Sequence, residues 1–291
     1  MSWRTVVITG NAKLDYKMDY MVVRKADVTT RIYLGEIGLL LIESTAVSLT
    51  TMLLCELTKH KVKVVFCDEK HNPQTELAAY YGSHDTSVKV RNQIGWNSET
   101  KEMVWTEIVS EKIRQQKLHL IEQGCIPQAE LLDQYLHEIE FGDRTNREGH
   151  AAKVYFNALF GMEFTRNKEC AVNAALNYGY GILLSYFNRE VVANGYITQL
   201  GLFHDNMFNQ FNLSSDLMEP FRILVDRLTM DMQPQKFEKE EKMEFIYMLE
   251  DEVMIDGKCQ YISNAIKIYC KSVFDALNDK DISLLKFYEQ I

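Results

Sequence analysis

The sequence predicts an α+β protein in which a small β-rich N-terminal domain, residues 1–72, precedes a larger α-helical domain, residues 73–291. Short segments rich in Val, Ile and Thr, separated by turn residues, fill the first part and are typical of strands. After Pro73 the apolar residues recur every third or fourth position, which indicates helices. Gly and Pro together number only 18, so long uninterrupted helices are expected.

The N-terminal part is predicted to alternate strands with one helix. Ser44 or Thr45 is expected to cap that helix, which would end near Lys59, because a hydroxyl accepts a hydrogen bond from the first turn. The polar stretch that ends in Pro73 is predicted to be the linker between the domains. The predicted strands are Val6–Thr9, Met21–Lys25, Thr29–Leu34, Gly38–Ile42 and Val62–Phe66.

The C-terminal part is predicted to be helical, with one hairpin. Asp256 and Gly257 form the predicted hairpin tip, because this pair favours a tight turn. Asn194 and Gly195 end the most apolar helix. The predicted helices are 108–123, 127–139, 147–160, 169–192, 216–230, 263–277 and 282–289.

Charge is unevenly distributed between the two parts. The net charge is −9, which excludes a uniformly basic nucleic-acid-binding surface. Residues 1–77 carry 10 basic and 9 acidic side chains, whereas residues 78–291 carry 22 and 32. The acidic excess therefore belongs to the helical part, where it forms either a solvated surface or a set of carboxylates that bind metal.

The six cysteines and the apolar runs predict a cytoplasmic location. The cysteines form no CxxC pair and match no zinc-binding spacing, so free structural thiols are expected. The N-terminus has no signal-peptide apolar region, and the longest apolar run, near Ile37–Ile42, is too short to span a bilayer. We expect no membrane association and a reducing compartment.

Two segments place a single metal-type ligand in a specific local setting. Glu148 lies at the start of a helix whose next turns are small and apolar, so its carboxylate can face a cavity or simply complement the helix dipole. His204 follows an apolar loop and precedes Asp205 and Asn206, either of which can orient an imidazole. Taken in isolation, the second segment is better explained by an ordinary loop histidine with a satisfied backbone hydrogen bond.

A third segment carries two carboxylates and an arginine on one helix face. Asp216, Glu219 and Arg222 are each three residues apart. Pro220 is best tolerated near a helix start, so the carboxylates are expected in or close to the first turn. An acidic first turn is the structural alternative. One histidine with two or three carboxylates suits Mg²⁺ or Mn²⁺ better than structural zinc.

Two further groups of residues have open interpretations. Asn173, Asn177 and Tyr180 are three to four residues apart in an apolar helix, where they either support a polar site from below or accompany close helix packing. Lys112, Arg114 and Lys117 form a basic cluster, which is either a solvated helix face or a track for phosphates.

In this order, the segments resemble the CRISPR-associated adaptation integrase family, Cas1, and its type II branch. The residues that carry the resemblance extend over nearly the whole chain. They are Glu148-Gly-His-Ala-Ala, Asn173-Ala-Ala-Leu-Asn-Tyr-Gly-Tyr-Gly, Gly201-Leu-Phe-His204 and Asp216-Leu-Met-Glu219-Pro-Phe-Arg222.

The resemblance implies a role for each of these site residues. Glu148, His204 and Glu219 match the family's catalytic metal ligands, with Glu219 standing where many relatives have Asp. Asp216 matches an acidic residue that is either a ligand or a neighbour of the metal. Arg222 matches a position that is basic in relatives, and we expect it to contact the DNA backbone.

The resemblance also implies a reaction and partners. The family inserts short double-stranded DNA fragments into CRISPR array DNA by 3′-OH attack on a phosphodiester, with Mg²⁺ or Mn²⁺ as cofactor. It acts as a homodimer, and two dimers flank a dimer of a small CRISPR-associated partner subunit. The type II effector nuclease and a ring-forming adaptation subunit are further expected partners.

DNA binding by an acidic chain requires local basic contacts, since phosphates are neutralised by individual Lys and Arg side chains. The candidates are Lys112, Arg114, Lys117, Arg144 and Arg147. Two other functions remain open at this point. One is a non-catalytic DNA-binding assembly subunit of the same fold, and the other is a stand-alone metal-dependent nuclease.

Overall fold

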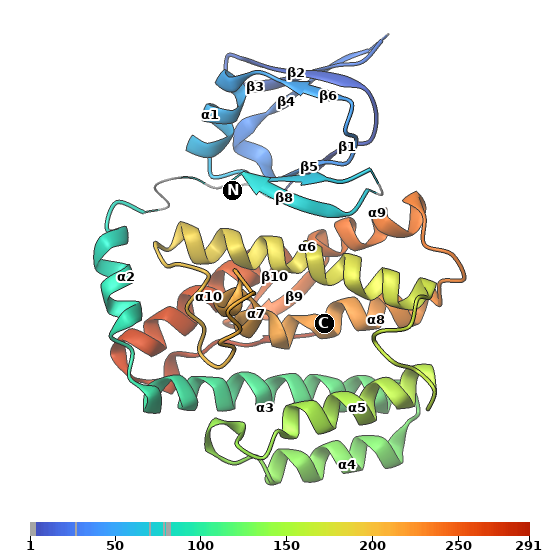
Figure 1. Cartoon of the computed structure of the whole chain (residues 1–291), viewed down its shortest axis with the longest axis vertical. Helices are drawn as coiled ribbons and strands as arrows, with labels where there is room; N and C mark the ends of the chain where they lie inside the picture. The colour runs from blue at the N-terminus through green and yellow to red at the C-terminus, as the bar shows by residue number, and fades with distance from the viewer. Residues whose placement is uncertain (1–3, 27, 70, 78, 80–82) are drawn as a thin grey trace.

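The computed structural model describes residues 4–26, 28–69, 71–77, 79 and 83–291. Figure 1 shows a β-rich lobe stacked on a larger helical part, with strand β8 lying above helix α6. The α+β fold class predicted from the sequence is confirmed.

Two four-stranded sheets form the N-terminal lobe. One has the order β1-β5-β7-β8, in which the first three strands are parallel and β8 is antiparallel. The other has the order β4-β3-β2-β6. The elements are β1 (Arg4–Ile8), β2 (Ala12–Lys17), β3 (Tyr20–Arg24), β4 (Thr29–Tyr33), η1 (Leu34–Glu36), β5 (Ile37–Ile42), β6 (Val47–Leu49), α1 (Thr51–Lys59), β7 (Lys63–Cys67) and β8 (Pro73–Leu77).

Strand β5 joins the two halves of the molecule. All six of its residues are buried, since it is covered on both faces. Leu40 and Ile42 point into the core of the N-terminal lobe, while Leu39 and Leu41 belong to the core of the helical part. Successive side chains on a strand alternate between faces, so one apolar run serves two cores.

In this lobe, one prediction is wrong in detail and two strands were not predicted. The helix predicted to begin after Ser44 or Thr45 begins at Thr51, and the side chain of Thr50 caps it by accepting from Leu53 N at 3.3 Å. The preceding residues Val47–Leu49 instead form β6, which pairs with β2. Neither strand was predicted, because β2 contains no Val, Ile or Thr and β6 is only three residues long.

The predicted linker is the turn of a hairpin. Strand β8, Pro73–Leu77, pairs antiparallel with β7, so the boundary between the two parts lies after Leu77 and not at residues 72 and 73. Asp68 N donates to Asn72 O at 2.9 Å across the turn. A polar, Pro-containing stretch is equally typical of a turn and of a linker.

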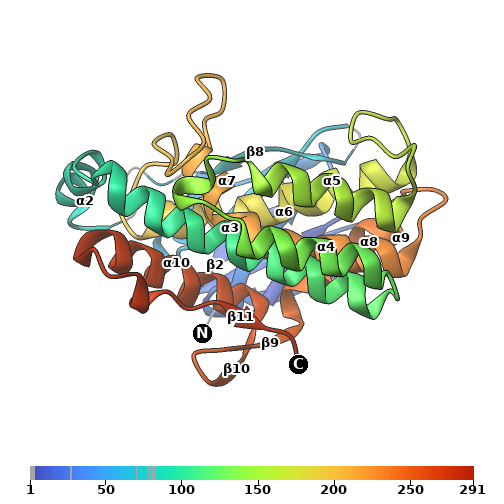
Figure 2. The same cartoon turned by 90° about the horizontal axis from the view of Figure 1, so that it is seen from below.

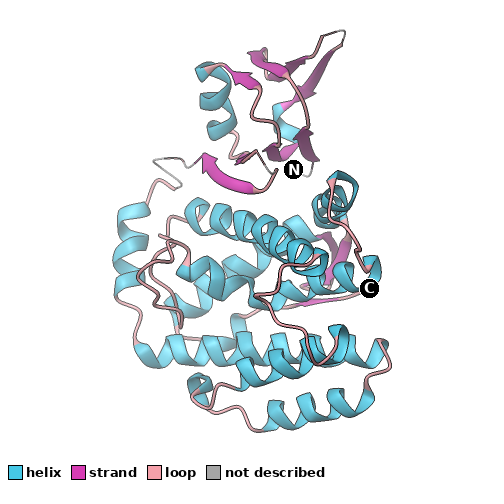
Figure 3. Ribbon diagram, turned by 45° about the vertical axis from the view of Figure 1, so that its right-hand side comes forward, coloured by secondary structure: helices cyan, strands magenta, loops and turns pink. Residues whose placement is uncertain are grey.

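The C-terminal part is a layered helical bundle with one small sheet. Figure 2 shows α3, α4 and α5 side by side on its outer face, and Figure 3 shows its few strands apart from those of the upper lobe. The elements are α2 (Thr86–Ile94), α3 (Ser98–Glu122), α4 (Ile126–His137), η2 (Phe141–Asp143), α5 (Arg147–Phe160), α6 (Ala171–Ala193), α7 (Asn212–Met218), η3 (Glu219–Phe221), α8 (Arg222–Met232), α9 (Lys239–Tyr247), η4 (Met248–Glu250), β9 (Glu252–Ile255), β10 (Lys258–Tyr261), α10 (Ile262–Asp279), η5 (Ile282–Leu284) and β11 (Tyr288–Glu289).

Helix α6 lies in the middle of this part. It contacts α7, α8, α9 and α10 as well as β7 and β8 of the upper lobe. A helix that is apolar on most of its surface can be covered on every side, which agrees with the sequence of α6. Through α6 the helical part is held against the N-terminal lobe.

Two C-terminal predictions are also wrong. The helix predicted over 216–230 is three pieces, α7, η3 and α8, because Pro220 interrupts the hydrogen-bond ladder. The helix predicted over 282–289 is the turn η5 followed by β11, which pairs with β9. A short apolar run does not distinguish a helix from an extended segment. The predicted hairpin at Asp256 and Gly257 is confirmed.

The sequence also predicted free cysteines and apolar segments too short to span a membrane. All six cysteines are free, with Cys67 and Cys270 buried and Cys55 and Cys259 exposed. In the part of the chain that the structure describes, no helix is both long enough and apolar enough to cross a membrane.

Candidate active site

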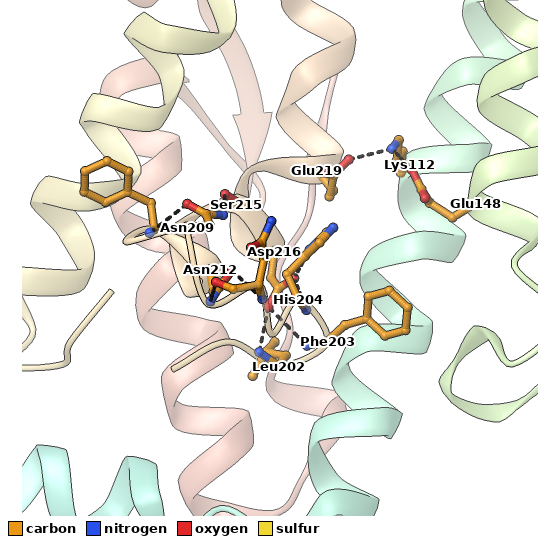
Figure 4. A network of polar contacts seen from close by, with 12 residues as sticks. Lys112, Glu148, Leu202, Phe203, His204, Asn209, Asn212, Ser215, Asp216 and Glu219 are labelled. Atoms are coloured by element: carbon orange, nitrogen blue, oxygen red, sulfur yellow. Dashed lines mark hydrogen bonds and ion pairs between the residues drawn. The ribbon is translucent and has the colours of Figure 1, made fainter. Parts of the chain in front are cut away.

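Glu148 is positioned by the start of helix α5. Asn146 adopts a left-handed conformation with φ 54°, caps the helix and accepts from Gly149 N at 3.3 Å. Asp143 accepts from Arg147 N at 2.7 Å and from Glu148 N at 3.1 Å. The first turn of α5 is therefore fixed by two acceptors, and Glu148 projects from it toward helix α3 (Figure 4).

His204 is held by Asp216 across the loop between α6 and α7. The buried Asp216 carboxylate accepts from the backbone N–H groups of Leu202, Phe203 and His204 at 2.6, 3.1 and 3.2 Å. His204 Nδ1 lies 2.5 Å from Asp216 Oδ1. Both carboxylate oxygens of Asp216 are therefore engaged in hydrogen bonds with the loop and the imidazole. Asp216 orients His204 and does not face the site.

This arrangement requires a glycine at position 201. A Cβ on Gly201 would lie 2.4 Å from His204 O and 2.7 Å from Asp216 Oδ2. No such contact is tolerated, so only glycine lets the loop close over the carboxylate. The hydrogen bond with Asp216 raises the pKa of His204, an effect that outweighs partial burial.

An aromatic pair supports the same loop from helix α3. Phe203 stacks on Trp105 with ring centroids 4.6 Å apart and an interplanar angle of 4°. The His204 ring meets Trp105 edge-on at 5.8 Å. Trp105 is 1% exposed, so it is a fixed wall of the site.

Glu219 lies where α7 gives way to η3, next to Pro220. Its Oε2 is 2.5 Å from Lys112 Nζ, and its Oε1 accepts from Arg222 Nε at 2.9 Å. Burial alone would raise the pKa of Glu219, but Arg222 and Lys112 outweigh it and lower that pKa. Glu219 opens η3, so it lies in the first turn of a short helix beside Pro220, as expected. The same expectation is wrong for Asp216, which lies in the second half of α7.

Lys112 bridges the two glutamates. Its ammonium contacts Glu148 as well as Glu219, and Figure 4 shows the three side chains meeting between helices α3, α5 and the α7–η3 junction. Lys112 is only 6% exposed. The interpretation of this position as part of a solvated helix face is therefore wrong, because the Lys112 charge is turned into the site.

A buried polar group lies behind Arg222. The guanidinium carbon of Arg222 is 4.7 Å from the centroid of the Tyr180 ring, and the Tyr180 hydroxyl donates to buried Asp226. Asn173 and Asn177 accept from Arg166 at 2.8 and 2.6 Å. Of the predicted supporting residues, Tyr180 therefore touches Arg222 directly.

Asn173 and Asn177 contact the site only indirectly, through Arg166. Arg166, which they hold, lies 5.2 Å from the Tyr180 ring centroid. Asn173 also donates to Thr165 O and Lys168 O, at 2.8 and 2.7 Å, and so closes the turn that precedes α6. Their contacts are with this turn and with Arg166.

The types of side chain at Glu148, His204 and Glu219 are suited to a divalent ion, although these three predicted ligands do not form one compact cluster. Among the described residues no three His, Cys, Asp or Glu side chains are close enough to hold one ion in this conformation. Two carboxylates nevertheless converge on a single cationic atom, the Lys112 ammonium. Because Asp216 engages Nδ1 of His204, the opposite ring nitrogen, Nε2, is the one left to bind an ion.

The remaining predicted DNA contacts are paired with carboxylates. Arg114 pairs with Glu111 and Lys117 with Asp133. Arg144 Nη2 is 3.0 Å from Glu102 Oε2, and Arg147 Nη2 is 2.8 Å from Glu138 Oε2. Arg222 is engaged by Glu219, so its immediate role is to hold that carboxylate.

Several residues of the site were not identified from the sequence. Asp143 carries a signal, since it precedes the helix start by four residues, but Trp105 and Asp226 look like ordinary helix residues. Whether Trp105 and Asp226 lie in the site depends on which face of α3 and of α8 is packed against the rest of the protein. That choice is made by packing between helices that are distant in sequence.

Comparison with known proteins places the chain among described relatives. Residues 5–254 match the family described as CRISPR associated protein Cas1. A CRISPR-associated endonuclease Cas1 from Neisseria meningitidis serogroup C (strain 8013) is 32% identical over 294 aligned residues, which cover 99% of this chain and 97% of the relative.

Solved structures share the fold. A casposase bound to integration product matches with a TM-score of 0.76 and 16% identity, covering 96% of this chain and 91% of that chain. A Cas6-RT-Cas1–Cas2 complex matches with a TM-score of 0.75 and 17% identity. That match covers 97% of this chain, which spans only 36% of the longer chain in the complex.

Proposed function

Because the chain belongs to the Cas1 family of CRISPR-associated proteins, we propose that it is a DNA integrase and endonuclease of CRISPR adaptation. Its active centre is the site formed by Glu148, His204 and Glu219. One observation carries this assignment. Carboxylates from α5 and from the α7–η3 junction converge on one cation, beside an imidazole that Asp216 orients.

The proposed reaction exchanges one phosphodiester for another. The 3′-OH of a DNA fragment loses its proton, and its oxygen forms a new bond to a phosphorus of the array strand. The bond from that phosphorus to the 3′-oxygen of the array strand breaks, and the released oxygen takes up a proton. No nucleotide energy source is needed, which agrees with the lack of a P-loop motif in the sequence.

A divalent ion, Mg²⁺ or Mn²⁺, is the proposed cofactor. Glu148, Glu219 and Nε2 of His204 would hold it, since oxygen-rich sets with one nitrogen suit these ions. When bound, such an ion polarises the phosphodiester and favours an ionised attacking oxygen.

The surrounding residues position these groups. Asp216 accepts the Nδ1 proton of His204 and so fixes the tautomer in which Nε2 carries a lone pair. Arg222 holds one oxygen of Glu219, which directs the other oxygen into the site. Trp105 and Phe203 stack and fix the loop that carries His204.

The proposed assembly is a homodimer, with two dimers flanking a dimer of a small Cas2-type subunit. The match to a Cas6-RT-Cas1–Cas2 complex supports a partner of this type. Two active centres per integration event suit a fragment with two 3′ ends. In a type II system, the effector nuclease and a ring-forming subunit would also take part in fragment selection.

Joining by purified components tests this function. The protein, a Cas2-type subunit, a labelled fragment with free 3′-OH ends, array DNA and Mn²⁺ should give a joined product. Glu148→Ala and His204→Ala should each abolish joining, because each removes a proposed ligand of the ion. A fragment that ends in 3′-deoxy nucleotides should remain unjoined with the wild-type protein.

Two exposed residues on α4 provide matched controls. Glu130→Ala and His137→Ala remove the same types of side chain outside the site, and both variants should join normally. Full joining by Glu148→Ala and His204→Ala would reject the proposed active centre. Cleavage without joining, independent of the partner, would favour a stand-alone nuclease.

A further inference from the structure

A lysine occupies the position between the two proposed acidic ligands. The Lys112 ammonium contacts Oε1 of Glu148 and lies 2.5 Å from Oε2 of Glu219. Lys112 and Glu219 are 6% and 4% exposed, so water barely screens their charges. Without a cation between them, two carboxylates brought this close would repel each other, and Glu219 would remain buried without one of its partners.

The two oxygens of Glu219 have different partners. Arg222 binds Oε1, while Lys112 binds Oε2. Arg222 is further held over the Tyr180 ring, so its position is fixed from two sides. If the ammonium withdrew, Glu219 would keep its orientation through Arg222, and Oε2 would become available to another cation.

The solvent side of the pair is formed by Glu148. Its side chain is 26% exposed, whereas that of Lys112 is 7% exposed, so an ion from solution reaches Glu148 first and finds the ammonium behind it. A lysine can yield this place because its charge sits on a flexible four-carbon stem. Buried Asp226 is near enough to interact electrostatically with Lys112 and is a third acidic side chain near its ammonium, beside Glu148 and Glu219.

We propose that Lys112 is the built-in counter-ion of the metal-free site, and that a divalent ion must displace its ammonium from Glu148 and Glu219 in order to bind. This inference rests on the proposed function, since it concerns the same two carboxylates. The ammonium and the ion require the same oxygens, so their binding is mutually exclusive. Lys112 is accordingly a positioning residue that sets the affinity of the site for its ion.

Calorimetric titration of Mn²⁺ into Lys112→Met tests the competition. Methionine keeps most of the side-chain length and removes the charge. The variant should bind Mn²⁺ roughly tenfold more tightly or better, because one like charge leaves the site. In the absence of metal it should melt at a lower temperature than the wild type, and Mn²⁺ should raise its melting temperature by a larger amount.

Lys63→Met is the matched control. Lys63 is 5% exposed and is paired with Glu76, but it lies in β7 of the N-terminal lobe. This variant should lose stability without any change in Mn²⁺ affinity. Equal or weaker Mn²⁺ binding by Lys112→Met would overturn the inference and leave the proposed function intact. Absence of Mn²⁺ binding in the wild type and in the variant would overturn both.

The wild-type protein provides a second measurement, which observes the ammonium of Lys112 directly. A buried, ion-paired ammonium exchanges its protons slowly and gives a resolvable nitrogen–proton NMR signal. The Lys112 signal, assigned by its absence in Lys112→Arg, should shift or broaden in proportion to the Mg²⁺ bound. An unchanged signal in protein saturated with Mg²⁺ would refute the displacement.

Discussion

Asp226 is a buried acid that supports the site from behind. It is 1% exposed, accepts a hydrogen bond from the Tyr180 hydroxyl and lies near Arg222. Burial raises the pKa of Asp226 to about 6, and neighbouring donors and cations only partly offset this effect. A raised pKa in the folded protein means that folding favours the protonated acid.

The stability of the protein should therefore fall as Asp226 ionises. Below its ordinary pKa of 3.8 the acid is neutral in both folded and unfolded chains, and its contribution is complete. As the pH rises through about 6, the wild type should lose about 3 kcal/mol relative to Asp226→Asn, which does not titrate. Urea unfolding of both proteins, at pH values from below 3.8 to above 6, measures how the difference between their free energies of unfolding changes with pH.

The difference between the two proteins isolates this titration, because every other ionisable group is common to both. A stability difference between wild type and Asp226→Asn that stays constant with pH would mean that the pKa of Asp226 is the same in the folded and unfolded chains, and would contradict a raised pKa.

At the scale of elements, helix α6 depends on close approach at one glycine. A Cβ on Gly179 would lie 2.5 Å from Val225 Cγ1 of α8 and 2.7 Å from Phe245 Cδ1 of α9. Both neighbours are fully buried and cannot move freely. Two residues along the same helix, Gly181 has only Pro73 Cγ nearby, at 3.9 Å.

These two glycines give a matched pair of substitutions. Gly179→Ala should lower the free energy of unfolding by about 1–3 kcal/mol, because the added methyl group overpacks the contact among three helices. Gly181→Ala should instead raise it by about 0.5–1 kcal/mol, since alanine favours the helix and finds room. Urea unfolding compares them, and equal effects of the two substitutions would contradict the close packing.

At the scale of the molecule, the acidic charge does not prevent DNA binding, but it limits where DNA can bind. Arg144 and Arg147 flank the start of α5 beside Glu148, yet each is paired with a glutamate. Ion pairs at exposed positions, such as Arg144–Glu102, contribute at most about 1 kcal/mol. Arg147 is half-buried, but the Glu138 side of its pair is exposed to solvent. A phosphate can therefore replace the glutamate partner at little cost.

Salt-dependent DNA binding tests this exchange. Arg144→Gln with Arg147→Gln should weaken binding to duplex DNA and reduce the slope of log affinity against log salt by about two, one for each lost phosphate contact. Glu102→Gln with Glu138→Gln should strengthen binding, because the arginines lose their competitors. Unchanged affinity and slope in the arginine variant would exclude both residues as DNA contacts.

Much of the fold follows from local patterns. The period of the apolar residues predicts most helices and strands, including the 14 residues of α5 and the hairpin at Asp256. Where local signals are ambiguous the prediction is wrong, as at Pro73, which marks a hairpin turn and not a linker. Residues 282–289 show the same ambiguity, since an edge strand depends on its partner β9.

By itself the sequence determined the fold class, the order of the segments that carry Glu148, His204 and Glu219, and the family. Each of these depends on residue type and spacing along the chain. Only the tertiary structure decided that Asp216 is turned away to hold His204, and that Lys112 faces inward between two glutamates. The role of a charged side chain depends on its partners across space, and packing among α3, α5 and the α7–η3 junction selects those partners.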